Sequence, residues 1–492
     1  MPLASRPPAG EETVRRAGRW IEERTHLRDA ILPILQHPVP KMGHKGWFYV
    51  LGSATLVAFI IQIATGVALA FTYEPDTRDV YQVLTFLSYR GSWGSLLRGM
   101  HYWGANAMFF FIGMHILQVF LFGSYKYPRE LNWITGVLLF FLTIFMGFSG
   151  QLLRWDQDAY WAVVVGAEQA GKVPIIGNFL LKVIIAGNHV SGTTLSRFFA
   201  THVFLLPALM MLLILVHLSL IILDGISELP EPGRTVDPKT YRQWYKTLVQ
   251  REGEPFFPDA MWRDAVFALG VVAVVVLLAK VIGPIKLGPE ANPTNILTYP
   301  RPDWYLLWYF AILALMPPQI ENEVIVGLPP LIFILMIMVP FISNHGERAP
   351  SRRPWAVALA GGIVLMVAAL TVVAYQAPWS PVIDAAATVP IPADIQERLT
   401  TSSQINGARL FQQKGCHSCH ALEGQGGIRG PDLTTIADRF SRDQMTARIL
   451  NGAANMPAFA GNLNGSDMKD LVNFLETLQT PSQQRVPSSV GA

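Results

Sequence analysis

The sequence predicts an all-α protein, a bundle of membrane-spanning helices followed by a small helical domain outside the bilayer. Three observations lead to this fold class. Of the 492 residues, 51% are hydrophobic and only 15% are charged, whereas about a quarter of an average soluble protein is charged. Seven apolar segments have the length of about 20 residues that a spanning helix needs. The two cysteines, Cys416 and Cys419, lie together in one Cys-His-Ser-Cys-His run.

Spanning helices are expected at the seven apolar segments, and a shorter apolar stretch is expected to form a loop helix. That stretch, 304–316, is bracketed by prolines and is too short to cross a bilayer. The residues before the first span are arginine-rich with periodic apolar positions, and they lack the apolar core of a signal peptide. They predict an amphipathic helix on the membrane surface. The expected spans are 47–72, 100–122, 131–150, 200–223, 264–283, 324–342 and 354–375.

Positive charge indicates how the chain is oriented in the membrane. Lys and Arg favour the connections that would share a side with the N-terminus, and cytoplasmic connections usually carry this excess. We therefore expect a cytoplasmic N-terminus, and seven spans then place everything after residue 376 on the outer side. The net charge of only +3 gives no indication of a nucleic-acid partner.

The expected organisation has six parts. A tether is indicated by Pro, Ala, Thr and Ser after the last span, and the final residues resemble a loose tail. The parts are an amphipathic surface segment (1–46), a four-helix bundle (47–225), a three-helix region with an outer loop (226–376), a linker (377–403), a small helical domain (404–480) and a tail (481–492).

Four histidines lie within the second and fourth spans at matched spacing. His101 and His115 are 14 residues apart, and His202 and His217 are 15 apart. At about 100° and 1.5 Å per residue, each pair falls on one helix face, about 21–22 Å apart. Two such helices could hold two haems one above the other, with His101 paired to His202 and His115 to His217. Histidines satisfied by interhelical hydrogen bonds are the alternative, which four matched positions make less favourable.

Four glycines repeat the same spacing. Gly52 and Gly66 are 14 residues apart in the first span, as are Gly136 and Gly150 in the third. A residue without a side chain lets a helix approach a flat macrocycle closely. Ordinary packing of small residues between helices is the alternative, and the shared 14-residue step favours haem.

The Cys-His-Ser-Cys-His run predicts covalent attachment of a c-type haem through Cys416 and Cys419, with His420 as an iron ligand. A zinc site would need a second Cys or His cluster, which the sequence does not contain. The second axial ligand should be a methionine, because a thioether raises the potential of the iron. Met456, in Asn-Met-Pro-Ala-Phe, resembles the methionine loop of class I cytochromes c. Packing roles are expected for Met445 and Met468.

Three longer runs resemble the cytochrome b family of cytochrome bc complexes over residues 40 to 375. They are PRELNWITGVLLFFLTIFMGFSG (128–150), WDQDAYWA (155–162) and SGTTLSRFFATHVFLLP (191–207). The 15-residue spacing and the seven spans resemble the bf-type branch, with cytochrome b and its companion subunit in one chain. The resemblance implies a low-potential haem near the outer face, at His101 and His202, and a high-potential haem at His115 and His217. Arg98 and Arg197 become candidates for pairing with haem propionates, although Arg98 could also snorkel to the surface.

Pro302-Asp303-Trp304-Tyr305 matches the Pro-Glu-Trp-Tyr motif of the family, with Asp in place of Glu. The resemblance implies that Asp303 accepts a proton from quinol and that Tyr305 hydrogen-bonds the quinol or supports its pocket. A partly desolvated carboxylate suits this role because its pKa rises. The alternative for Asp303 is an ordinary helix N-cap. Trp304 is expected to pack, and Tyr160 is a weaker pocket candidate.

Some positions depart from the family pattern. Val50 stands where photosynthetic relatives have a cysteine, which excludes a covalent third haem there. Gln151 and Arg154 replace a Tyr and a Pro beside the presumed quinol pocket, so its detailed shape differs. For a quinone-reducing site near the cytoplasm, the nearby polar groups could equally be surface anchors. These are His44, Lys45 and Asp224.

The resemblance implies a catalytic subunit of a quinol:cytochrome c oxidoreductase in a prokaryotic cytoplasmic membrane. Quinol would be oxidised near the outer face, and electrons would pass across two non-covalent b haems and, through a Rieske iron–sulfur protein, to one covalent c haem. Proton transfer outward would accompany this flow. The Rieske cluster needs cysteines of its own, so that protein must be a separate partner. A homodimeric complex, a c domain on the periplasmic side and a cytochrome c or other downstream acceptor are also implied.

Two other classes of protein remain possible. A haem-bearing membrane anchor could conduct electrons for another subunit without oxidising quinol, and it would have no use for a proton acceptor such as Asp303. An ion transporter would lack a b-type redox spectrum.

Overall fold

The computed structural model describes residues 9–187, 189–292, 301–317, 319–376, 389–427, 430–452, 456, 459 and 463–480. Within them, seven helical segments are long and apolar enough to cross a membrane, and the expected loop helix α13 (Trp304–Leu315) is shorter. The prediction of an all-α fold with seven spans is confirmed. The spans are α3 (Leu51–Ala70), α5 (Ser92–Leu121), α6 (Glu130–Leu152), α9 to α10 (Gly192–Asp224), η3 with α12 (Phe256–Val281), α14 (Glu321–Ile342) and α15 (Pro354–Gln376).

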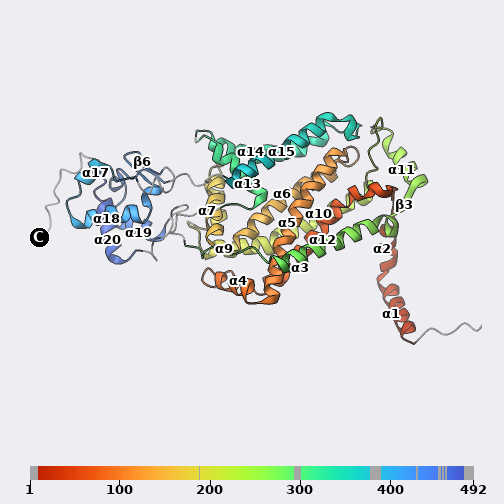
Figure 1. The fold of residues 1–492 in the computed structure, drawn as a ribbon, viewed down its shortest axis with the longest axis horizontal. Coiled ribbons are helices and arrows are strands. Elements are labelled where there is room, and N and C mark those ends of the chain that lie inside the picture. Colours follow the sequence, from red (N-terminus) through yellow and green to blue (C-terminus); the bar gives the residue numbers. More distant parts are fainter. Residues whose placement is uncertain are drawn as a thin grey trace, which may run out of the picture.

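The first four spans form the centre of the membrane part. Helix α3 packs on α5 and α10 packs on α6, while α12 lies against α3 and α5, and α14 contacts α6 (Figure 1). A buried core of Ala58, Phe59, Met108 and Met210 lies near the middle of the first, second and fourth spans. Met108 stands halfway between His101 and His115 in the sequence, so this apolar layer separates the two levels of histidines.

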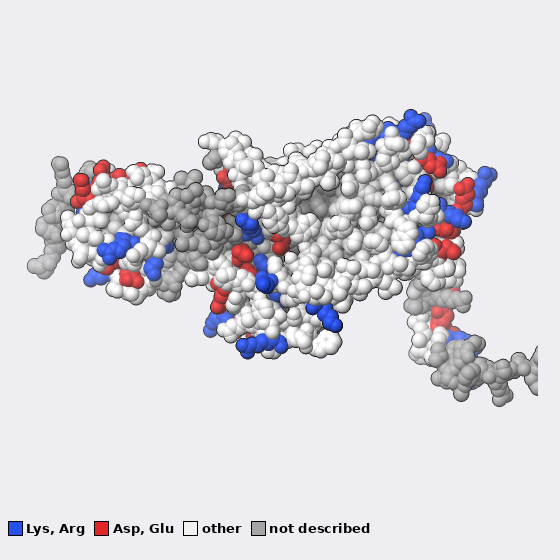
Figure 2. Space-filling model, in the orientation of Figure 1, with Lys and Arg blue, Asp and Glu red and all other residues white. Residues whose placement is uncertain are grey.

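The surface of the bundle agrees with a membrane location. Figure 2 shows Lys, Arg, Asp and Glu gathered at the two ends of the bundle, with a broad uncharged surface between them. Because charged side chains are costly in hydrocarbon, this belt is the part that the bilayer covers.

Shorter helices and loops close the end of the bundle near His101 and His202. This end is expected to face outward, and it is called the outer end below. Asp156 begins α7, where its Oδ1 accepts the Ala159 N–H at 3.0 Å and its Oδ2 accepts the Gly288 N–H at 3.0 Å. This fully buried carboxylate therefore joins the α6–α7 turn to the segment that leads toward residue 303. The outer helices are α4 (Val80–Tyr89), α7 (Gln157–Gly171), α8 (Gly177–Ile185) and α13.

The opposite end, near His115 and His217, carries the N-terminal helices and two small sheets. It is expected to face the cytoplasm, and it is called the cytoplasmic end below. In Figure 1 the helix α1 runs across the direction of the bundle helices, which suits the expected position on a membrane surface. The elements are α1 (Ala9–Thr25), α2 (Leu27–Leu35), η1 (Gly43–Tyr49), α11 (Tyr241–Glu252), η4 (Pro350–Arg352), β1 (Pro38–Pro40) paired antiparallel with β3 (Gly253–Pro255), and β2 (Thr235–Val236) paired antiparallel with β4 (Gly346–Glu347).

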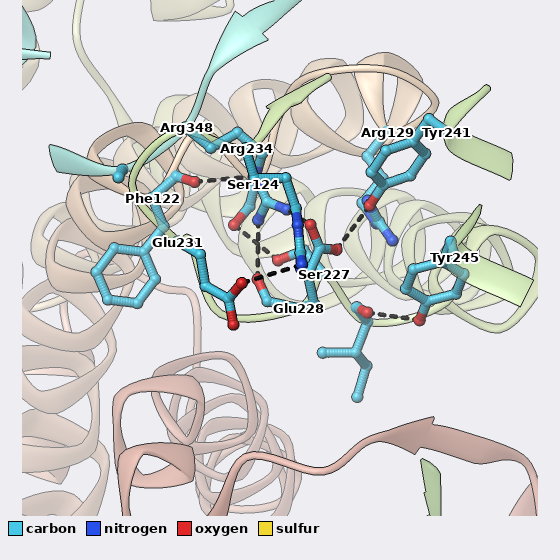
Figure 3. Close-up of polar contacts among 12 residues, drawn as sticks. Phe122, Ser124, Arg129, Ser227, Glu228, Glu231, Arg234, Tyr241, Tyr245 and Arg348 are labelled. Atoms are coloured by element: carbon cyan, nitrogen blue, oxygen red, sulfur yellow. Dashed lines mark hydrogen bonds and ion pairs between the residues drawn. The ribbon is translucent and has the colours of Figure 1, made fainter. Parts of the chain in front are cut away.

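A buried polar network holds the loops at this end together (Figure 3). Arg348 forms an ion pair with the Glu228 carboxylate and donates to the Glu228 carbonyl at 3.0 Å and the Phe122 carbonyl at 3.3 Å. Tyr241 donates to the other Glu228 oxygen at 2.7 Å, and Arg129 donates to the Tyr241 hydroxyl at 2.7 Å. Loops that follow α5, α10 and α14 are thus joined through the Arg348–Glu228 ion pair.

Removing Arg348 should destabilise the protein strongly. Burial raises the pKa of Glu228, but the nearby Arg348 and Arg129 guanidiniums hold it below its usual value. In Arg348→Met the ionised Glu228 would stay buried without its main partner, which costs about 3–5 kcal/mol. We expect a clear fall in the unfolding temperature of the detergent-purified protein, and recovery of most of it on adding Glu228→Gln. Arg352→Met, at an exposed position in the same loop, should have little effect.

The C-terminal part forms its own hydrophobic core around Phe411, Leu471 and Phe474. The core also contains Ile391 and Ile395, which come from the segment predicted as linker. The first part of the predicted linker, 377–388, and the predicted tail lie outside the described residues. The elements are α17 (Ala393–Glu397), α18 (Ser402–Gln413), η5 (Cys416–Ser418), β5 (Ala421–Leu422) paired with β6 (Gln425–Gly426), η6 (Ile436–Asp438), α19 (Arg442–Asn451) and α20 (Gly465–Leu475).

Candidate functional site

The structure brings the predicted histidine ligands together inside the bundle. The rings of His101, from α5, and His202, from the π-helical turn η2 (Thr201–Leu205), have centroids 6.3 Å apart at 80° to one another. His115 and His217 lie further along α5 and α10, on the far side of the apolar layer. Two levels of histidines therefore stand within one four-helix bundle.

Each of the four predicted glycines lies against one histidine ring. An added Cβ would approach a ring Cε1 to between 2.7 and 3.5 Å at all four positions. The missing side chains therefore make room for the imidazoles themselves, a contact that the 14-residue spacing did not indicate. The pairs are Gly66 with His101, Gly150 with His202, Gly52 with His115 and Gly136 with His217.

Three hydroxyl groups that the sequence analysis missed contact the histidines. Nδ1 of His101 lies 2.9 Å from Thr65 Oγ1, Nδ1 of His202 lies 2.9 Å from Ser149 Oγ, and Nδ1 of His217 lies 2.8 Å from Thr135 Oγ1. Each hydroxyl residue stands immediately before one of the four glycines. A hydroxyl residue followed by glycine was therefore the sequence pattern that could have predicted these contacts.

The buried polar groups at the outer histidine level fit a haem. Arg98 is buried, its Nη1 donates to Ser88 Oγ at 2.8 Å and to the Ile285 carbonyl at 2.9 Å, and its Nη2 has no hydrogen-bond partner within the described part of the chain. An unpaired guanidinium N–H on the residue one helical turn before His101 suits an anionic group such as a propionate. Arg197, the other candidate, is exposed and donates to the Val183 carbonyl at 2.9 Å.

Asp303 and Tyr305 form a pair at the outer end of the bundle. Asp303 precedes α13, yet its side chain makes no capping hydrogen bond there; it accepts the Tyr305 hydroxyl at 3.2 Å. The Tyr305 ring stacks on Phe109 with centroids 3.6 Å apart, and its hydroxyl lies over Gly147 of α6, where a Cβ would come within 2.6 Å of it. Gly147 is a further residue that the sequence analysis missed.

Charges from the α6–α7 turn surround this pair. Burial raises the pKa of Asp303, and the positive charge of Arg154 acts in the opposite direction. Arg154 Nε lies 3.7 Å from the Asp156 carboxylate and is largely buried. Burial also raises the pKa of Asp158 on the same turn, where Asp156 adds to the rise. Arg154, which stands where the family has proline, is thus the counter-charge of an acidic cluster.

Trp304 and the weaker pocket candidate Tyr160 have simpler surroundings. Trp304, which was expected to pack, is exposed, and its Nε1 donates to Asn106 Oδ1 at 2.6 Å. Tyr160 is buried beside Trp155 and Trp161, and burial raises the pKa of Tyr160 to about 12.

At the cytoplasmic level, the structure adds a carboxylate to the expected polar groups. His44 and Lys45 are exposed, and Asp224 forms an ion pair with Arg242 at 3.4 Å. Asp264, in the first turn of α12, accepts the Ser53 hydroxyl at 2.5 Å, and Ser53 follows the glycine that faces His115. Asp264 could not be assigned from sequence because its partner is 211 residues away.

Cys416, Cys419, His420 and Met456 all lie in the lining of one continuous cavity of about 3390 Å³. Most of that lining comes from helices of the membrane part, and the C-terminal domain supplies the rest. His420 Nδ1 lies 2.8 Å from the Pro431 carbonyl, and burial lowers the pKa of His420, which favours the neutral, iron-binding form. The side chains that were not expected to bind iron are buried. His417 lies between the Val389 and Gln425 carbonyls, and Met445 and Met468 belong to the domain core, although Met445 also lines the cavity.

Replacing Met456 by histidine should lower the midpoint potential of the c-type centre. An imidazole donates more strongly than a thioether, so the oxidised iron is favoured. A redox titration followed at the c-type absorption band measures this shift, with Met445→Leu as the matched control. An unchanged potential would exclude Met456 as an axial ligand.

Sequence comparisons identify relatives of each part of the chain. Residues 36–225 match the family Cytochrome b/b6/petB, residues 290–390 match Cytochrome b(C-terminal)/b6/petD, and residues 403–475 match Cytochrome C oxidase, cbb3-type, subunit III. The cytochrome bc complex cytochrome b subunit of Chlorobaculum thiosulfatiphilum is 33% identical over 330 residues, which cover 67% of this chain and 74% of that protein. Cytochrome b6 of Prochlorococcus marinus (strain NATL1A) is 38% identical over 208 residues, covering 42% of this chain and 94% of that protein.

A solved structure shares the architecture. A chain of the hyperthermophilic respiratory Complex III superposes with a TM-score of 0.62 at 27% identity, covering 73% of this chain and 91% of that chain. These families imply b-type and c-type haems in an electron-transport protein that crosses the membrane several times. The chain belongs to the cytochrome b family of cytochrome bc complexes, with a cytochrome c domain fused to its C-terminal side.

Proposed function

We propose that the chain oxidises membrane quinol at its outer end and reduces quinone at its cytoplasmic end, as the catalytic subunit of a quinol:cytochrome c oxidoreductase. The observation that carries this proposal is the partly buried, hydrogen-bonded pair of Asp303 and Tyr305, which stands at the end of the bundle that holds His101 and His202. Two non-covalent b haems and one c haem, when bound, supply the electron carriers. A separate Rieske iron–sulfur protein is the expected first acceptor, in a dimeric complex with the c domain outside the cytoplasm.

The chain's own contribution to quinol oxidation is proton handling. Asp303 is desolvated, so its pKa is raised and it can hold a proton that a quinol hydroxyl releases. Tyr305 keeps the carboxylate in position by donating to one of its oxygens. Arg154 limits the rise in the pKa of Asp303, because its positive charge favours the ionised carboxylate that can accept the proton.

Quinone reduction at the other end takes up protons from the cytoplasm. Asp264 is a candidate donor because it is the partly buried carboxylate beside Ser53 and the His115 level. The opposite positions of Asp303 and Asp264 along the bundle would make the net proton transfer outward.

An electron conduit without quinol chemistry is the alternative. The geometry of Asp303 favours quinol oxidation, because a purely structural aspartate at this position would cap α13, whereas this side chain makes no such bond.

Titration of the purified complex tests the proposal. We expect two b-type components at separate potentials, one covalent c-type haem, and reduction of cytochrome c by added quinol that requires the Rieske subunit. A single b-type component, or haems that quinol does not reduce, would refute it.

The charge of Arg154 should appear in the pH profile. Arg154→Leu removes the positive charge near Asp303, so the pKa of Asp303 rises further. Asp303 accepts a proton only when ionised, and the acid limb of the rate of quinol oxidation should therefore move to higher pH. Arg90→Leu, at an exposed outer position, should leave the profile in place. A uniform fall in rate without a shift would contradict this role.

A further inference from the structure

The direction of the hydroxyl–histidine hydrogen bonds follows from the helices that carry the hydroxyls. Thr65 Oγ1 donates to the Ile61 carbonyl at 2.6 Å, and Thr135 Oγ1 donates to the Leu131 carbonyl at 3.0 Å. Ser149 Oγ donates to a backbone carbonyl at 3.1 Å in the same way. A hydroxyl has one hydrogen, so each oxygen must accept a hydrogen bond from the histidine. The proton is then on Nδ1, and Nε2 keeps the lone pair that binds iron.

His115 is the exception among the four histidines. Its Nδ1 is buried and has no hydrogen-bond partner within the described residues. The Gln118 side chain, one turn further along α5, lies close enough to interact with the His115 ring, but it does not reach Nδ1 with hydrogen-bond geometry. The cause can be seen in the sequence. Thr65 precedes Gly66, but Leu51 precedes Gly52, so the matching position offers His115 no hydroxyl group.

This difference has an electronic consequence for bound iron. A ligating histidine whose other N–H donates a hydrogen bond is a more basic ligand, which favours oxidised iron and lowers the potential. The outer level has two such histidines, His101 and His202, and the cytoplasmic level has one, His217.

We propose that Thr65 and Ser149 lower the potential of the outer haem, and that Leu51 raises that of the cytoplasmic haem by leaving Nδ1 of His115 without a hydroxyl partner. These are positioning residues, which act on the iron through its ligands. Their arrangement drives electrons from the outer to the cytoplasmic level, and this part of the inference rests on the proposed function.

Two opposite substitutions test the inference in the intact complex. Thr65→Val removes a hydrogen bond and should shift the midpoint potential of the outer b-type component upward. Leu51→Thr adds a hydroxyl at the matching position and should shift that of the cytoplasmic component downward. Both are measured by optical redox titration, which does not depend on turnover. Thr65→Ser keeps a hydroxyl at this position and should therefore leave the midpoint potential of the outer component at its original value.

Thr55→Val is the matched control. Thr55 lies on α3 and donates to the carbonyl four residues earlier, as Thr65 does, but no hydrogen bond joins it to a histidine among the described contacts. If both b-type components are present and neither Thr65→Val nor Leu51→Thr moves a potential, the inference is wrong while the proposed function stands. If Thr65→Val fails to bind haem, the inference is tested by Leu51→Thr alone, and an unchanged potential of the cytoplasmic component would contradict it. Absence of b-type haem from the unaltered protein would instead refute the proposed function.

Discussion

Replacing His202 by alanine is expected to remove one of the two b-type haems and to abolish quinol-dependent electron transfer. The substitution leaves His101 without the ring that faces it at 6.3 Å, so the outer level would keep one axial ligand from the chain. It also opens space against Gly150, which water or a neighbouring side chain could enter. The b-to-c haem ratio of the purified protein, measured after haem extraction, reports the loss.

His189→Ala is the matched control for this substitution. His189 is an exposed histidine outside the four spans that form the bundle core, so both haem content and turnover should be unchanged. Full b-haem content and normal turnover in His202→Ala would remove the basis of the haem assignment.

Replacing Asp303 by asparagine is expected to slow quinol oxidation by about 10²–10⁴-fold, the usual contribution of a general base. Asparagine has almost the same shape, and its carbonyl can still accept the Tyr305 hydroxyl, but it cannot take up a proton. Steady-state reduction of cytochrome c by quinol measures the rate, and the titrated haem potentials show that the electron carriers are intact.

Asp76→Asn, in the outer connection between the first two spans, is a suitable control because Asp76 is exposed and bonds only its own turn and Arg78 among the described contacts. If Asp303→Asn oxidises quinol at the normal rate, the conduit interpretation becomes the better one.

The features predicted from sequence depend on short stretches of chain. Whether a segment spans the bilayer depends on its own length and hydropathy, so all seven spans could be found. Their ends were less accurate: α5 begins at Ser92 and η3 at Phe256, several residues before the apolar segments expected at 100 and 264. Polar and aromatic residues continue a helix beyond the hydrocarbon, where hydropathy no longer detects it.

The two levels of the histidines could be predicted from sequence for a similar reason. Regular helices convert spacing into depth and direction, so the intervals between His101 and His115 and between His202 and His217 place them at two levels. The hydrogen-bond partners of those rings could not be predicted. Thr65 and Ser149 contact His101 and His202 but are far from them in the sequence, and hydroxyl residues are common in helices.

The sequence by itself determined the seven spans, the two levels of histidines and the haem-attachment run, because each follows from helix periodicity or from a contiguous motif. Only the tertiary structure decided that Asp303 accepts Tyr305 instead of capping its helix, and that Arg154 faces an acidic cluster. It also decided that, of the four histidines, only His115 has no Nδ1 partner within the described residues. Those properties depend on which distant segments share a low-dielectric interior, where a hydrogen bond or a charge acts most strongly.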